Sequence, residues 1–137
     1  MARKSIGTMM GSQTTSTFLG IPAGTLSDVS GGSVVFGAPC ATPYPSVGAY
    51  CKDAPDAIRG AISSYQANIH HMDFDLGGPI FPNGVNAIDL GNLEFDESDA
   101  AGNRERIRST VSQIVAKDGV PVVIGGDDSI PIPMIEG

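Results

Sequence analysis

The chain has 137 residues, of which 41% are hydrophobic and 17% are charged, so its composition fits one globular domain and excludes a disordered chain. Its formal net charge of −7 argues against a nucleic-acid partner and weakly favours a cationic ligand or a metal. No apolar stretch approaches the ~20 residues of a membrane span, and the N-terminus lacks the apolar run of a secretory signal. We therefore expect a soluble cytoplasmic protein with no membrane partner.

The two cysteines, Cys40 and Cys51, are too few for a disulfide framework. We expect two reduced thiols and an intracellular compartment, with a single bridge as the alternative.

The first 31 residues are rich in serine, threonine and glycine and show no hydrophobic period. We expect an N-terminal arm over 1–31, with packing on a partner subunit as one role, and an α/β domain over 32–137. The run SVVFGAP at 33–39 predicts a buried strand closed by glycine and proline. The prolines of CATPYPSVGAYCK, at 40–52, predict a loop.

A helix is predicted over 54–66, with Asp53 as its N-cap and Pro55 in its first turn. Its expected apolar face consists of Ile58, Ala61, Ile62 and Tyr65. The run GVNAIDLGNL at 84–93 predicts the second strand.

A second helix is predicted over 98–117, because acidic residues crowd its start and Lys117 and Gly119 close it. Its expected apolar stripe consists of Ile107, Val111, Ile114 and Val115. The run VPVVIGG at 120–126 predicts the third strand.

Strands that alternate with helices indicate a parallel sheet with helical crossovers. Ligands of such sheets collect at the carboxyl ends of the strands. The run GGDDS stands at that end of the third strand, so Asp127 and Asp128 are placed where a site is expected. Two adjacent carboxylates also require a nearby positive charge or a solvated position.

Three stretches together, VVFGAPCATPYPSVGAYCKDAPDAIR, NAIDLGNL and GVPVVIGGDDSIPIP, resemble the N-terminal part of a ureohydrolase of the arginase/agmatinase family. The family pattern has a Gly-Val-Pro strand end, an Ile-Arg on the first helix, an Asp-x-Gly-Asp strand and then Gly-Gly-Asp-His-Ser. The resemblance implies a three-layer α/β arginase-like fold, of which this chain is the N-terminal βαβαβ part.

The resemblance also implies an agmatinase-like hydrolase that releases urea from a small guanidino substrate by means of hydroxide activated at a binuclear metal site. Two Mn²⁺ ions are implied, with another divalent metal as the alternative, together with a homo-oligomer (trimer or hexamer). The family's metal-ligating histidine matches Asp128, and Asp127 matches a supporting residue beside the metal site. No catalytic residue is identifiable in this chain, and the substrate-binding residues are unknown.

Several positions depart from the family pattern. Asp128 replaces the histidine, Asn92 replaces an aspartate, and Ala41 with PSVGAY replaces an aspartate and an arginine-bearing loop, which argues against agmatine itself as the substrate. The family's later ligand motifs, Asp-Ala-His-x-Asp and Ser-x-Asp-x-Asp, would follow residue 137. The chain is therefore a portion of a longer protein, is completed by another chain, or acts as a non-catalytic ureohydrolase-like subunit or assembly partner.

Other residue groups have structural interpretations that we favour. HHMDFD at 70–75 is expected at the surface rather than at a metal, and Arg59 in an ion pair rather than at the substrate. The arginines of 104–108 are expected on a solvated helix face. A Cys40 nucleophile lacks a histidine with a fixed position beside it. A nucleotide-binding module is disfavoured because the loop after the first strand is long and proline-rich.

Overall fold

One all-parallel sheet organises the computed structural model, which describes residues 17–82 and 86–137. Its strands are β1 (Gly32–Ala38), β2 (Ala87–Asn92) and β3 (Gly119–Gly125), in the order β2-β1-β3. β1 pairs in parallel with both neighbours, so the predicted parallel βαβαβ arrangement is confirmed. Each predicted strand overlaps the observed one, although residues 84 and 85 of the second lie outside the described residues.

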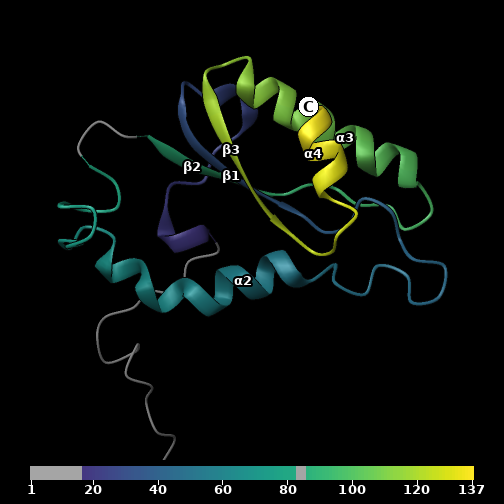
Figure 1. Ribbon diagram of the computed structural model, residues 1–137, viewed down its shortest axis with the longest axis horizontal. Helices are drawn as coiled ribbons and strands as arrows, with labels where there is room; N and C mark the ends of the chain where they lie inside the picture. The colour runs from purple at the N-terminus through teal and green to yellow at the C-terminus, as the bar shows by residue number, and fades with distance from the viewer. Residues whose placement is uncertain (1–16, 83–85) are drawn as a thin grey trace, which may run out of the picture.

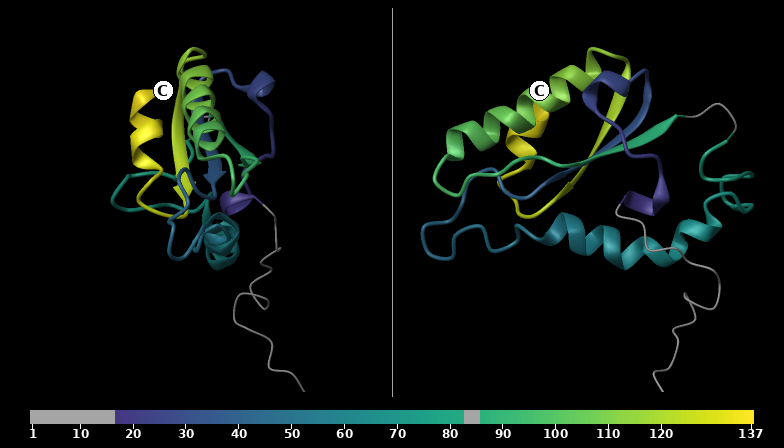
Figure 2. Two further views of the ribbon diagram at one scale, coloured as in Figure 1. Left: turned by 90° about the vertical axis from the view of Figure 1, so that its right-hand side faces the viewer. Right: turned by 180° about the vertical axis from the view of Figure 1, so that it is seen from behind.

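Helices cover both faces of this sheet, as Figures 1 and 2 show. One face carries α3 (Ala100–Val115) and the short α4 (Pro131–Glu136), and the other carries α2 (Ala54–Ile62). Three short 3₁₀ helices, η1 (Phe18–Gly20), η2 (Leu26–Asp28) and η3 (Ser63–Asn68), complete the elements of the described residues. The layers match the expected three-layer α/β arrangement.

The core divides into two apolar layers because side chains of β1 alternate between the two faces of the sheet. Val34 and Phe36 pack toward α3, against Ile107 and Ile114. Val35 packs on the opposite face, in a smaller cluster with Ile21 and Ile124. The sheet is therefore anchored on both faces, which fixes the positions of the strand ends.

The predicted helix over 54–66 is correct in place, and Ile58 of its expected apolar face packs against the smaller core cluster, but the rest of that face is only partly correct. The α-helix ends at Ile62 and continues as the 3₁₀ helix η3. Ala61 and Tyr65 are exposed, whereas Arg59 is buried, because Arg59 has an ion-pair partner beneath the helix. Asp53 occupies the N-cap position, but its side chain makes no capping hydrogen bond there.

The predicted helix over 98–117 is confirmed, with two differences. Asp99 is the N-cap, and its side chain accepts a hydrogen bond from the backbone N–H of Gly102. Val115 is exposed, whereas Thr110 on the neighbouring helical row is buried. At the end of the helix the left-handed conformation falls on Asp118, with φ 57°, rather than on Gly119.

The described part of the predicted arm, residues 17–31, packs on the chain's own sheet. Ile21 and Val29 are buried, and Ala23 forms a parallel bridge with Asp89 of β2. Residues 1–16 lie outside the described residues, so the boundary at residue 31 stays a prediction. No helix in the described part of the chain is long and apolar enough to cross a membrane.

Candidate metal centre

The turn after β3 lies against the loop after β1 because Gly126 has no side chain. A Cβ on Gly126 would lie 2.1 Å from the carbonyl oxygen of Pro39 and 2.8 Å from that of Cys51. The backbone N–H of Gly126 donates to the Ala38 carbonyl at 3.2 Å. This close approach brings Asp127 and Asp128 beside the loop of residues 39–52, at the carboxyl ends of the strands.

Asp127 holds that turn and the neighbouring loop together. Its Oδ1 accepts hydrogen bonds from the backbone N–H and the hydroxyl of Ser129, at 3.0 and 2.5 Å. The Ser129 hydroxyl oxygen in turn accepts from the backbone N–H groups of Ala41 and Thr42, at 3.1 and 3.0 Å. Asp127 therefore positions the loop through Ser129.

The other Asp127 oxygen, Oδ2, is buried and has no hydrogen-bond partner among the described residues. The buried Cys40 thiol is close by: burial, together with the neighbouring Asp127 carboxylate, raises the pKa of Cys40 to about 11. The thiol stays protonated at neutral pH, which disfavours a Cys40 nucleophile. Cys40 and Cys51 are both free thiols, as predicted.

Asp128 points its carboxylate to the exposed side of the same turn. Its Oδ1 accepts a hydrogen bond from the hydroxyl of Tyr44, across the loop. The ring of Tyr44 packs at 58° against that of Tyr50, with centroids 5.9 Å apart. The hydrogen bond to Asp128 is the main cause that raises the pKa of Tyr44 to about 12, so the phenol remains a proton donor. Sequence reasoning missed Tyr44, since nothing local pairs it with a residue 84 positions away.

The donor atoms at this turn fit part of a site for a hard divalent cation. Carboxylate oxygens are ligands that such cations prefer, and Asp127 Oδ2 is a buried acceptor that no described residue contacts by a hydrogen bond. Across residues 17–82 and 86–137, however, no group of three or more histidine, cysteine, aspartate or glutamate side chains is arranged to hold an ion. Asp128 as a ligand and Asp127 as its support stay predictions, and further ligands are required.

A second polar network anchors the carboxyl end of β2. Buried Asp89 receives two hydrogen bonds from Arg59, at 2.9 and 2.8 Å, so the predicted ion pair of Arg59 is confirmed. Asn92 accepts from Arg59 Nη1 at 2.5 Å and donates to Asp56 at 2.8 Å. Asn92, which replaces the family aspartate, therefore serves this network in the structure.

Asp89 remains ionised although it is buried. Burial raises the pKa of its carboxyl, but hydrogen bonds from Arg59 and from the backbone N–H groups of Phe18 and Gly91 outweigh burial and lower it. An aspartate in the middle of the apolar run NAIDLG was the available signal for a buried partner of Arg59.

The HHMDFD stretch has the surface role that the sequence predicted. His70 and His71 are exposed. Asp73 Oδ1 accepts from the backbone N–H groups of Asp75 and Leu76, both at 3.0 Å, which forms a local turn. The structure therefore assigns Asp73 to turn formation.

The arginines of α3 are partly exposed, and each has a hydrogen-bond partner. Arg104 donates to the Thr42 hydroxyl at 2.9 Å, and Arg106 to Asn103 at 2.8 Å. Arg108 bridges α3 to α4 through Glu136, at 2.6 Å. These contacts fasten α4 and the loop after β1 to the helix layer.

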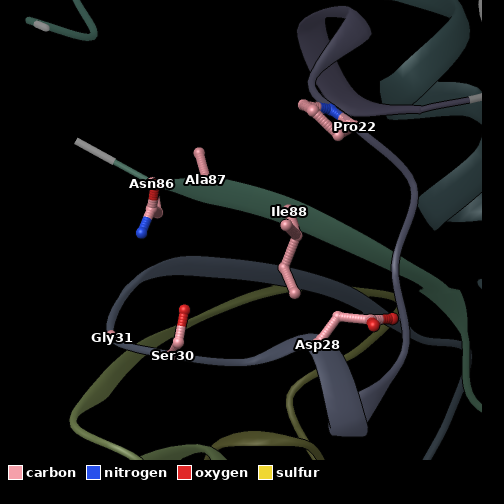
Figure 3. Close-up of a pocket in the computed structure, with 7 residues that line it drawn as sticks. All are labelled: Pro22, Asp28, Ser30, Gly31, Asn86, Ala87 and Ile88. Carbon is pink, nitrogen blue, oxygen red and sulfur yellow. The ribbon is translucent and has the colours of Figure 1, made fainter. Parts of the chain in front are cut away.

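A cavity of about 250 Å³ lies at the opposite end of the sheet (Figure 3). Gly31 and Asn86, in its lining, immediately precede β1 and β2, so it borders the amino ends of the strands. The carboxylate of Asp28 there accepts hydrogen bonds from the backbone and hydroxyl of Thr25, at 2.8 and 2.6 Å. This cavity is therefore separate from Asp127 and Asp128.

Comparison with known proteins identifies one family that matches this chain. The sequence profile described as "Arginase family" matches residues 32–137. A curated relative, the formimidoylglutamase of Halalkalibacterium halodurans, is 28% identical over 85 residues, which cover 61% of this chain and 25% of the relative. The match thus spans a quarter of the relative's length. With its parallel sheet and its Gly-Gly-Asp turn at the expected strand end, this chain belongs to the arginase family.

Proposed function

We propose that the protein containing this chain is a metal-dependent amidinohydrolase that hydrolyses a guanidino compound to urea and an amine. Membership of the arginase family supports this reaction class. The observation that carries the proposal is the exposed Asp128 carboxylate at the carboxyl end of β3, directly after the Gly-Gly-Asp that positions it. Sites of parallel α/β sheets lie at this edge.

Each residue of the turn has a distinct part in this proposal. Asp128 would hold one of two divalent ions, of which manganese suits carboxylate oxygen. When bound, the ions supply Lewis acidity and lower the pKa of water. Asp127 holds the turn through Ser129 and keeps the loop of residues 39–52 in place.

The loop over this turn suggests which guanidino compound is preferred. Residues 43–50 contain no charged side chain and expose Val47 and Tyr50 instead. We propose a guanidino substrate other than agmatine, with a small compound of zero net charge as the first candidate.

A panel of substrates tests this preference with the full-length protein. Agmatine, guanidinobutyrate and guanidine are compared by urea release, and N-formimidoylglutamate, suggested by the name of the relative, by substrate loss. We expect a higher kcat/KM for guanidinobutyrate or guanidine than for agmatine. Preference for N-formimidoylglutamate, which has no guanidino group, would contradict the proposed substrate class. A clear preference for agmatine would contradict the assignment of this loop.

A non-catalytic subunit is the second candidate function. It is favoured by Asp128 standing where the family has a histidine, and by the lack of a three-residue ligand group within 17–82 and 86–137. The full-length protein, loaded with Mn²⁺ and assayed for bound metal and turnover of the panel, separates the two. Two ions per chain with turnover support the enzyme, whereas a folded protein without metal or turnover supports the subunit.

Location and assembly extend the proposal. We place the protein in the cytoplasm as a homo-oligomer, trimer or hexamer, and light scattering of the purified full-length protein measures the number of subunits. A monomer at micromolar concentration would exclude the proposed assembly.

A further inference from the structure

Tyr44 holds the carboxylate of Asp128 from the other side of the site. Asp128 is exposed at the tip of a turn, where its side chain would otherwise rotate between several rotamers. The Tyr44 hydroxyl donates to Asp128 Oδ1, so one oxygen is fixed by a protein donor. A carboxylate has about four lone-pair sites, so this bond leaves others for a cation.

The backbone fixes Tyr44 before any ligand binds. Tyr44 and Gly48 exchange two backbone hydrogen bonds, at 3.2 and 2.8 Å, which close the loop between them. Gly48 has φ +63°, a backbone conformation that residues other than glycine rarely adopt. On the other side, Ser129 holds the backbone of Ala41 and Thr42.

The aromatic ring of Tyr44 has its own support. Tyr50 packs against it at a centroid distance of 5.9 Å, and Tyr44 is 37% exposed. The position of the Tyr44 hydroxyl is therefore restrained by the backbone hydrogen bonds of Tyr44 with Gly48 and by the ring of Tyr50. Such a rigid donor can orient a ligating carboxylate, since partners of metal ligands commonly fix ligand geometry.

We propose that Tyr44 is a positioning residue for Asp128. By orienting the Asp128 carboxylate, Tyr44 raises the affinity of the site for a divalent cation. This inference rests on the proposed function, because it takes Asp128 as a metal ligand. Tyr44 belongs to the loop of residues 39–52, which departs from the family pattern. The proposed role accounts for the contact of its hydroxyl with Asp128.

The test uses Tyr44→Phe in the full-length protein, which removes the hydroxyl and keeps the ring. Tyr65→Phe is the matched control. Tyr65 is 61% exposed in η3, which follows α2, whereas the loop with Tyr44 precedes α2. The dissociation constant for Mn²⁺ is measured by electron paramagnetic resonance of the free ion. Melting temperatures are recorded with and without Mn²⁺.

We expect Tyr44→Phe to weaken Mn²⁺ binding by about tenfold, the lower end of the effect of losing a partner of a metal ligand. The melting temperature without metal should stay unchanged, and the increase that Mn²⁺ produces should shrink. Tyr65→Phe should match the wild type. In an Asp128→Asn background, Tyr44→Phe should add no further loss.

Two results would overturn the role of Tyr44 alone. One is an unchanged dissociation constant in Tyr44→Phe while the wild type binds Mn²⁺. The other is a melting temperature of Tyr44→Phe that falls below the wild-type value by the same amount with and without Mn²⁺. That result would show that the hydroxyl stabilises the fold rather than the metal site. A wild-type protein that binds no divalent cation overturns the proposed function and this inference together, so the two failures are distinguishable.

Discussion

At the scale of single residues, Asp127 and Asp128 share a turn but have separate surroundings. Asp127 turns inward, where Ser129 donates twice to its Oδ1. Asp128 turns outward, where the Tyr44 hydroxyl is its donor. The two adjacent carboxylates are tolerated because Ser129 donates to one oxygen of Asp127 and the carboxylate of Asp128 faces solvent.

Substitution of Asp128 separates a metal ligand from a structural residue. Asp128→Asn keeps the shape but removes the charge, so we expect lower Mn²⁺ occupancy with little change in the free energy of unfolding of the metal-free protein. Asp128→Ala should lose metal and activity together, whereas Asp128→His, the family residue, should retain or tighten binding. Metal content after dialysis measures each variant.

Capping of the following helix by Asp128 is the structural alternative, and the structure disfavours it. The N-cap position of α4 is Ile130, and no side chain makes a capping bond there. Full metal occupancy in Asp128→Asn would nevertheless contradict the ligand role.

Asp89 gives the protein an acid-sensitive element. Its pKa is lowered in the folded protein, so its stabilising contribution is present above the unfolded pKa of ~3.9 and is lost as pH falls through the folded pKa. Asp89→Asn should lower stability at neutral pH and flatten the decline below about pH 4. Thermal unfolding of the full-length protein across this range measures both slopes. Parallel acid profiles for wild type and variant would show that Asp89 does not contribute.

The sequence predicted the position of Asp127 and Asp128 at the end of the third strand and the ion pair of Arg59, and the structure confirms both. Sequence reasoning missed Tyr44 and Asp89 as partners, because both contacts join residues far apart in the chain. A long-range partner is set by packing of the elements, which hydrophobic periodicity does not encode.

At the scale of elements, periodicity predicted the three strands and both long helices, because apolar side chains on one face follow a fixed period. It assigned the buried face of α2 only in part: Ile58 packs on the core, but a charged residue, Arg59, enters the interior with its partner. It also misplaced Val115, since the stripe of α3 turns away from the sheet at its last residue. Both errors arise from tertiary contacts that override a local pattern.

The contact of the Gly126 backbone with the loop after β1 is the joint between these elements. Gly126→Ala would place a Cβ 2.1 Å from the Pro39 carbonyl oxygen. The clashing atoms at Pro39 and Cys51 belong to the backbone, so no flexible side chain can move away to relieve the clash. We expect a loss of roughly 1–3 kcal/mol in the free energy of unfolding, the usual cost of overpacking. Chemical denaturation of the full-length protein measures it, with Gly60→Ala in α2 as the control, since a Cβ there meets nothing within 4 Å. Equal stability of the two variants would contradict the close approach.

At the scale of the whole molecule, β3 is an edge strand of the sheet in the described residues. One apolar face of β3 is partly exposed. Val120 and Val122 are 60% and 37% exposed, whereas Ile124 on the same face is buried. Parallel sheets are normally covered on both faces, and an open strand edge invites association.

We therefore expect residues 1–137, expressed alone, to aggregate or to require further protein against β3. Size-exclusion chromatography and thermal unfolding measure this, with Val122→Lys as a variant that should reduce aggregation through an edge charge. A monodisperse, cooperatively unfolding monomer of this length would contradict the expectation.

The ligand position of Asp128 is tested most directly by a crystal structure of the full-length protein grown with Mn²⁺. We predict a carboxylate oxygen of Asp128 within about 2.0–2.6 Å of an ion, the range of hard-cation contacts with oxygen. The Tyr44 hydroxyl should remain on the other oxygen. An ion bound elsewhere, with Asp128 still facing solvent, would contradict this account of the site.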